Sequence, residues 1–108
     1  MKVQVKEIVP SQTPWHSQFD PNQEIGTFDV KVEIGNFQHQ FKLAVDIDLI
    51  GERQIQIVRT DDEFEEIFKF DLQFHRDICK LVSSVYNHQP VQLPTNLGEL
   101  EKAESLIG

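Results

Sequence analysis

The chain of 108 residues lacks the features that would tie it to a disulfide framework, a membrane or a nucleic acid. A single cysteine cannot form an internal disulfide, so a hydrophobic core must stabilise the fold, and a reducing compartment, the cytoplasm, is expected. No apolar run approaches the roughly 18 residues of a membrane span, and the alternating N-terminus does not resemble a signal peptide. With 10 Lys and Arg against 18 Asp and Glu, a net charge of −8, the chain lacks the basic clusters that a nucleic-acid partner requires.

Sequence signatures of catalysis and of cofactor binding are also missing. There is no GxSxG, no P-loop, no GxGxxG after a strand and no CxxC or HExxH. Their absence does not exclude an enzyme, but it favours a protein without catalytic activity, and we expect no cofactor and no bound metal.

What is present is a clear change of hydrophobic period near Thr60, from two before it to about 3.6 after it. The length suits one domain, residues 1–108, and the change predicts an α+β fold. We expect an antiparallel sheet of about four strands packed against a long helix and a short C-terminal helix. The predicted strands are 2–9, 26–34, 37–49 and 53–59, and the predicted helices are 61–88 and 96–107.

The clearest local signal is a β-hairpin around Gly35-Asn36. Both residues tolerate the positive φ that a two-residue turn needs, and apolar and polar residues alternate on either side. If Ile34 faces Phe37, apolar side chains share one face and Asp29 opposes Lys42 on the other. The other predicted pairs are Val32 with His39, Val30 with Phe41, and Phe28 with Leu43.

The next strand is expected after a tight connection at residues 50–52. Continued alternation directs Ile55 and Ile57 to the inner, apolar face of the sheet. The same alternation directs Gln54, Gln56 and Val58 outward.

A long connection, Pro10 to Glu24, precedes the hairpin and carries Trp15, His16 and Phe19. In one interpretation, Trp15 and Phe19 fold back over an edge of the core. In the other, the connection is a binding loop, because loops carry recognition more often than strands do.

A continuous amphipathic helix is predicted over residues 61–88, with Thr60 as the N-cap of a capping box and Pro90 after its end. At 1.5 Å per residue it would be about 42 Å long, which exceeds the roughly 30–35 Å width of a domain of this size. We therefore expect a homo-oligomer, by default a dimer, with this helix at the interface. Whether the helix is continuous or broken near Asp71 stays open.

Asp71, His75 and Cys79 fall one turn apart in the middle of the apolar face of this helix. A buried carboxylate must be paired or neutralised, and the i, i+4 spacing would let Asp71 meet His75. Three interpretations of this pair stay open. It is a structural pair, it forms a polar pocket or a pH-sensitive subunit interface, or it belongs to a metal or catalytic site. His39 faces inward from the hairpin and could join such a pocket.

The order of elements, a strand, a long loop, a three-stranded meander and a long amphipathic helix, resembles that of SecB-type export chaperones. The segment Pro90-Val91-Gln92-Leu93-Pro94-Thr95-Asn96-Leu97 is similar to the proline- and leucine-bearing segment after their helix. This chain is shorter and lacks the glycine- and cysteine-bearing stretch before that helix. The resemblance implies an acidic oligomer packed through its helices that holds extended apolar segments.

Together these features favour a non-enzymatic, homo-oligomeric protein-binding or adaptor module, and the resemblance to SecB-type proteins adds a chaperone-like version of it. The alternative is a small ligand-binding protein or enzyme with a pocket near His39, Asp71 and His75. Solvent access to these side chains would discriminate between the two.

Overall fold

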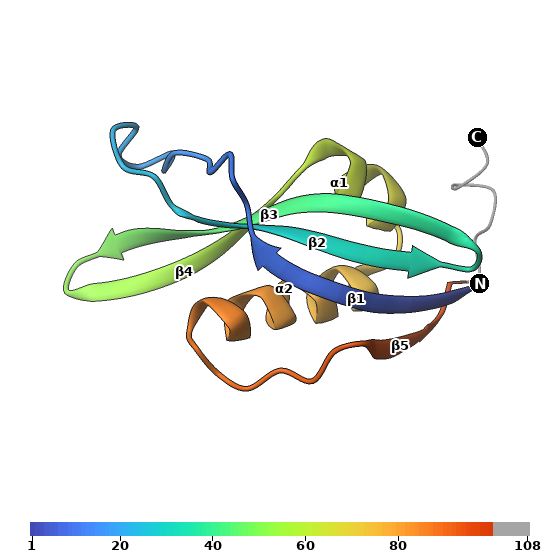
Figure 1. Cartoon of the computed structure of the whole chain (residues 1–108). Coiled ribbons are helices and arrows are strands. Elements are labelled where there is room, and N and C mark those ends of the chain that lie inside the picture. The colour runs from blue at the N-terminus through green and yellow to red at the C-terminus, as the bar shows by residue number, and fades with distance from the viewer. Residues whose placement is uncertain (101–108) are drawn as a thin grey trace.

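The chain has an α+β fold with one antiparallel sheet and two helices within residues 1–100, the part that this computed structural model describes (Figure 1). The strand order is β4-β3-β2-β1-β5, and neighbouring strands are antiparallel throughout. The elements are β1 Lys2–Pro10, β2 Gly26–Ile34, β3 Phe37–Ile50, β4 Arg53–Thr60, α1 Asp62–Phe68, α2 Leu72–Tyr86 and β5 Thr95–Glu99. Neither described helix is long and apolar enough to cross a membrane.

The β2–β3 hairpin confirms the predicted register. Ile34 lies opposite Phe37, Asp29 lies opposite Lys42, and Gly35 occupies the turn with φ of 60°. The three further predicted pairs are also present. Because one face of this hairpin is buried, a slip by one residue would expose its whole apolar set, and the alternation alone specifies the pairing.

The prediction for β4 was wrong by one residue. The connection after β3 is a two-residue turn, with Gly51 at φ of 65°, so Ile50 pairs with Arg53. Ile57 therefore lies opposite Asp46 on the outer face of the sheet, and Val58 lies opposite Val45 and packs against the core. Successive side chains of a strand point to opposite faces of the sheet, so a turn that is one residue shorter than predicted moves every side chain of β4 to the other face.

The long helix predicted over residues 61–88 is two helices, α1 and α2, separated by residues 69–71. The N-cap of α1 is Asp61 and not Thr60: the Asp61 carboxylate accepts a hydrogen bond from Phe64 N at 2.9 Å and another from Lys42 N of β3 at 2.7 Å. The Asp61 side chain therefore both starts the helix and satisfies a backbone donor of the sheet.

The helix predicted over residues 96–107 is also wrong where the structure describes it. Residues 95–99 form β5, which pairs with β1, and the remainder, 101–107, lies outside the described residues. The edge of β1 offers unpaired backbone groups, and Met1 reinforces the pairing because its amino group donates to Leu100 O at 2.8 Å. Backbone pairing outweighs the local helical pattern here.

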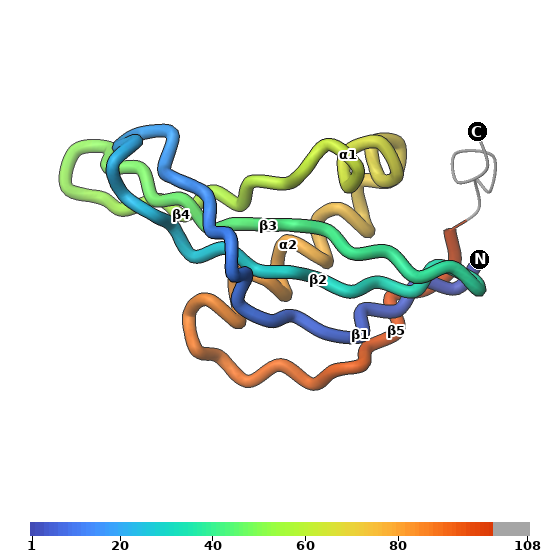
Figure 2. Tube along the Cα trace, turned by 45° about the horizontal axis from the view of Figure 1, so that its top comes forward, coloured from blue at the N-terminus to red at the C-terminus, as the bar shows by residue number. Residues whose placement is uncertain are grey.

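The core lies between the inner face of the sheet and both helices. Phe41 of β3 contacts the rings of Phe64 and Phe68 of α1, and Ile78 and Val82 of α2 are fully buried in the same cluster. The other face of the sheet is partly covered by residues 11–25, which lie beside the β3–β4 hairpin in Figures 1 and 2. The β2–β3 turn is at the opposite end, near the N-terminus.

Candidate functional site

Asp71 is the N-cap of α2, and its side chain does not pair with His75. Its carboxylate faces Phe74 N at 3.5 Å, and only its carbonyl oxygen accepts a hydrogen bond from His75 N. The predicted position on an apolar helix face is therefore wrong, because the helix is interrupted just before Asp71. The Asp71 carboxylate instead caps α2, where the first backbone N–H groups have no hydrogen-bond acceptor within the helix.

His75 does lie beside two other polar side chains. Its Nε2 lies 2.7 Å from Glu65 Oε2, and its Nδ1 lies 3.8 Å from Cys79 Sγ. The hydrogen bond from Thr60 lowers the pKa of the Glu65 carboxyl below its ordinary value, against the opposing effect of burial. The hydrogen bond and the charge of His75 lower this pKa further.

Glu65, His75 and Cys79 are arranged in the same order as the acid, the base and the nucleophile of a catalytic triad. The Cys79 thiol, however, is not ionised as such a nucleophile has to be. Burial, followed by the charge of Glu65, raises the pKa of the Cys79 thiol to about 11. Only the thiolate is a strong nucleophile, so the arrangement serves better as a contact between α1 and α2. Within residues 1–100, no three His, Cys, Asp or Glu side chains are grouped so that they could hold a metal ion.

His39 points to the inner face of β3, as its position in the hairpin predicts. Its ring stacks on Phe41 at 5.7 Å, and Nδ1 lies 3.4 Å from Glu63 Oε1. Its Nε2 is buried without a hydrogen-bond partner among the described residues. His39 and His75 both contact α1, but through different neighbours, Glu63 for the first and Phe64 with Glu65 for the second.

The predicted binding loop is held against the outer face of the sheet. The ring of Trp15 lies 5.9 Å from Lys42 Nζ and 5.3 Å from Arg59 Cζ, within the range of cation–π attraction. Arg59 also donates to the carbonyl oxygen of His16 at 2.8 Å. Phe19 is 44% exposed, so it does not cover the core; Trp15 covers two cationic side chains instead.

A buried carboxylate that the sequence did not single out fixes this loop. Asp46 accepts hydrogen bonds from Ser17 Oγ at 2.6 Å, from Gln18 N at 3.0 Å and from Ile47 N at 2.9 Å. Burial raises the pKa of the Asp46 carboxyl, but these hydrogen bonds and the charge of Arg59 outweigh it, so the pKa lies below its ordinary value. The loop is thus anchored to β3 by an ionised side chain.

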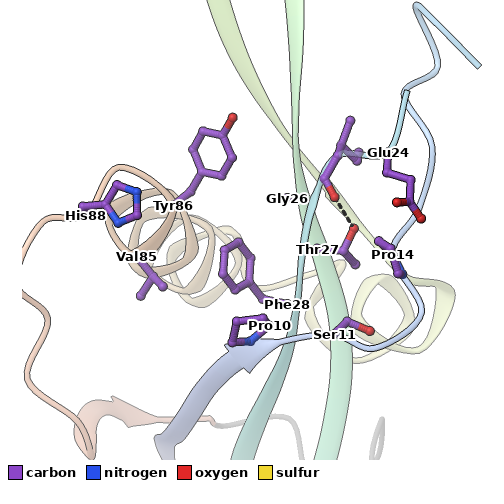
Figure 3. Close-up of a pocket in the computed structure, with 11 residues that line it drawn as sticks. Pro10, Ser11, Pro14, Glu24, Gly26, Thr27, Phe28, Val85, Tyr86 and His88 are labelled. Atoms are coloured by element: carbon purple, nitrogen blue, oxygen red, sulfur yellow. Dashed lines mark hydrogen bonds between the residues drawn. The ribbon is translucent and has the colours of Figure 1, made fainter. Parts of the chain in front are cut away.

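An open groove of about 630 Å³ lies beside this loop (Figure 3). It lies where both ends of the β1–β2 connection meet the C-terminal end of α2. Its lining is mostly apolar, and its size is within the range of about 300–1,000 Å³ that is typical of ligand sites. The residues that line it are Pro10, Ser11, Pro14, Glu24, Ile25, Gly26, Thr27, Phe28, Val85, Tyr86 and His88.

A glycine shapes one wall of the groove. A Cβ at Gly26 would lie 2.6 Å from two ring carbons of Tyr86, so only glycine lets the ring approach the start of β2 so closely. Phe28 follows on the same strand and points to the same side in Figure 3. Opposite the aromatic side chains, Thr27 is held by a hydrogen bond from its hydroxyl to Ile25 O at 2.9 Å.

The end of α2 supplies the rim. His88 has φ of 58°, and His88 N donates to Val85 O while Gln89 N donates to Ser84 O. This pattern of two bonds is a Schellman closure, which turns the chain away from the helix axis. The His88 ring and the Glu24 carboxylate are two of the polar groups that flank the apolar lining.

Sequence reasoning missed the groove because its residues come from three separate segments. Two signals in the sequence were compatible with it: the prolines at 10 and 14, and a glycine at the first position of an otherwise regular strand. A glycine at a strand position often marks the close approach of another group. Neither signal identifies that group as Tyr86, which lies 60 residues away in the sequence.

Comparison of the sequence with protein-family models finds no match, and a search of curated proteins finds no significant match.

Proposed function

We propose that this chain is a non-enzymatic protein-binding module that holds an extended apolar polypeptide segment in the groove between the β1–β2 connection and the end of α2. The observation that carries the proposal is the groove itself, open and lined mainly by Pro10, Pro14, Phe28, Val85 and Tyr86. Proline and aromatic rings offer broad contact without demanding one side-chain shape, which suits a binder of varied segments.

The charge of the molecule favours one class of segment. Glu24 lies at the groove, the net charge is −8, and none of the described residues that line the cavity is a lysine or an arginine. A segment that carries Lys or Arg beside its apolar residues would be attracted to this acidic surface, and its cationic side chain would pair with the Glu24 carboxylate.

We also propose that the module works as a homodimer. The sequence predicted an oligomer because a helix of about 42 Å would be longer than the domain, and this reason does not apply to two short helices. The open edge of the sheet at β4 is the feature that now supports a dimer.

The structure gives less support to a catalytic or small-ligand site near His39, Asp71 and His75. Asp71 acts as a helix cap, and the Cys79 thiol beside His75 is protonated at neutral pH. None of these residues lines the groove.

Peptide binding by the Val85→Lys variant tests the proposal. Val85 lines the groove near the end of α2, and a lysine there would have to be buried beneath a bound apolar segment. We expect the affinity for a fluorescent, unstructured Leu/Val peptide with flanking lysines to fall at least about tenfold in anisotropy titrations, equivalent to roughly 1.4 kcal/mol.

The matched control is Leu72→Lys, which adds the same charge at an apolar side chain that is 68% exposed and does not line the groove. It should bind the peptide like the wild type. Equal affinity of wild type and Val85→Lys would contradict the proposed groove, and so would equal weakening by both variants.

A further inference from the structure

Strand β4 forms an open edge of the sheet. It pairs with β3 on one side only, and among the described residues no strand follows it in the strand order. In a hairpin with a two-residue turn the flanking residues exchange hydrogen bonds, and the bonded pairs then alternate. Since Ile50 and Arg53 flank the turn, the residues at 54, 56, 58 and 60 direct their N–H and C=O groups away from β3.

Two of the devices that usually protect an edge strand, a proline and a β-bulge, are absent from β4. Residues 53–60 contain no proline, and their register against β3 has no bulge. The two charges stand at Arg53 and Arg59, which leaves an uncharged stretch of β-branched residues and glutamines between them. The opposite edge is different: β5 has five residues, contains Gly98, and shifts register against β1. Of the two edge strands within residues 1–100, only β4 therefore offers a long, regular template.

The edge is also held rigidly. The Gln56 side chain donates to Asn87 Oδ1 at 2.7 Å and accepts from Asn87 Nδ2 at 2.9 Å and from Ser83 Oγ at 3.1 Å. These bonds tie the middle of β4 to α2 on the inner face. A strand that is already fixed loses little entropy when a second strand pairs with it.

We propose that β4 pairs antiparallel with β4 of a second copy of this chain, around a twofold axis at Ile57. In this register Gln56 opposes Val58 of the other copy and Gln54 opposes Thr60, so every outward-facing backbone group of the four residues is paired. On the outer face Ile57 meets its own symmetry mate, and Ile55 meets Arg59. A register centred on Gln56 would instead oppose Arg53 to Arg59, and directly opposed like charges are destabilising.

A second copy fits this edge better than a strand of another protein because the pairing closes on itself. A twofold contact uses both β4 edges at once and, of the described strands, leaves the two short β5 edges at the ends of the joined sheet. The β5 edge cannot replace β4 as a partner over the same length, so the assembly stops at two copies. This inference rests on the homodimer part of the proposed function and is independent of the groove, which β4 does not line.

Cysteine cross-linking tests the pair and its register. Opposite residues of a non-hydrogen-bonded antiparallel pair have Cα atoms about 4.5 Å apart, within the range that a disulfide spans. In a Cys79→Ser background, Ile57→Cys should therefore form a disulfide-linked dimer under mild oxidation with diamide. Ile55→Cys and Ile50→Cys should not, because neither meets its own mate. Cross-linking of either one as fast as Ile57→Cys would overturn the proposal.

Light scattering on the full chain provides the second readout. The wild type should have a mass of about 25 kDa, twice the 12.6 kDa of one chain. Gln54→Pro removes an outward-facing N–H without touching the ladder to β3, and should give a folded monomer by circular dichroism and mass. A monomeric wild type would overturn the proposal, as would a dimer that Phe70→Ser, at the α1–α2 connection, dissociates and Gln54→Pro does not.

The two proposals fail separately. If the wild type is a monomer that binds the apolar peptide in the groove at Val85, the β4 dimer is contradicted and the groove is supported. If it is a dimer that cross-links at position 57 but binds no peptide, the groove is contradicted and the dimer is supported. A monomer that binds an extended acidic peptide, with binding lost in Gln54→Pro, would show that the edge takes a foreign strand and would overturn pairing with a second copy.

Discussion

At the scale of single residues, the carboxylate of Asp46 ties the β1–β2 connection to β3. It lies on the outer face of the sheet, where alternation places polar side chains, yet its side chain is only 1% exposed. Ser17 and the backbone of Gln18 fold over it and donate two of its hydrogen bonds. The conformation of the loop that forms one side of the groove therefore depends on one ionised group.

Asp46→Asn is expected to destabilise the fold by about 1–3 kcal/mol. The Ser17 hydroxyl can still donate to the amide oxygen, but the amide nitrogen would then face Gln18 N–H, and two donors cannot pair. Urea unfolding followed by tryptophan fluorescence measures the loss, since Trp15 lies in the same loop. Asp48→Asn, two residues further on the same face of β3, is the control and should change stability little. A similar loss in both variants would contradict this role of Asp46.

At the scale of elements, the break between α1 and α2 organises the helical layer. The chain leaves helical geometry at residues 69–71, and Asp71 starts α2. Because the chain turns there, α2 returns along α1 and places His75 against Glu65, ten residues earlier. A continuous helix would have carried residue 75 about 15 Å away from residue 65 along its axis.

Asp71→Ala should cost about 0.5–1 kcal/mol, the usual loss for an N-cap. A buried ion pair at this position would instead cost several kcal/mol on loss of one partner. Thermal unfolding of Asp71→Ala and Asp71→Ser distinguishes the two, because serine keeps the cap and loses the charge. We expect Asp71→Ser to retain nearly all the stability. A large loss in both variants would restore the interpretation as a charged pair.

At the scale of the whole molecule, the net charge of −8 conceals two carboxyl groups whose ionised forms stabilise the fold. The pKa values of Asp46 and Glu65 both lie below their ordinary values of 3.8 and 4.5. A depressed pKa in the folded state contributes stability that is fully present above the ordinary value and is lost as the pH falls through the folded value.

The free energy of unfolding should therefore fall as the pH drops from about 5 to about 3. Urea titrations at a series of pH values measure this slope. Glu65→Gln should give a shallower slope, because it removes one of the two groups. Parallel slopes for wild type and Glu65→Gln would contradict a stabilising role of the ionised Glu65 carboxylate, which Thr60 and His75 contact.

The candidate site was predictable only where its position followed from local pattern. Alternation placed His39 on the inner face of the hairpin, and helical spacing brought His75 and Cys79 together. The same spacing failed for Asp71, because a pattern of apolar residues does not reveal where a helix stops and restarts. The groove could not be predicted, since its walls meet only after β2 and the end of α2 pack together.

The sequence by itself determined the class of fold, the β2–β3 hairpin with its register, and the start of helix after the sheet. Each of these follows from contacts between near neighbours, which a periodic pattern encodes directly. Only the tertiary structure decided the face of β4, the fifth strand, the burial of Asp46 and the groove. These depend on one residue of turn length, on a free strand edge and on close approach between distant segments. The free energy of these contacts depends on two segments that are distant in the sequence, so the residue pattern of either segment alone does not reveal the contact. The charge that matters most is accordingly Asp46, whose importance appears only once Ser17 covers it.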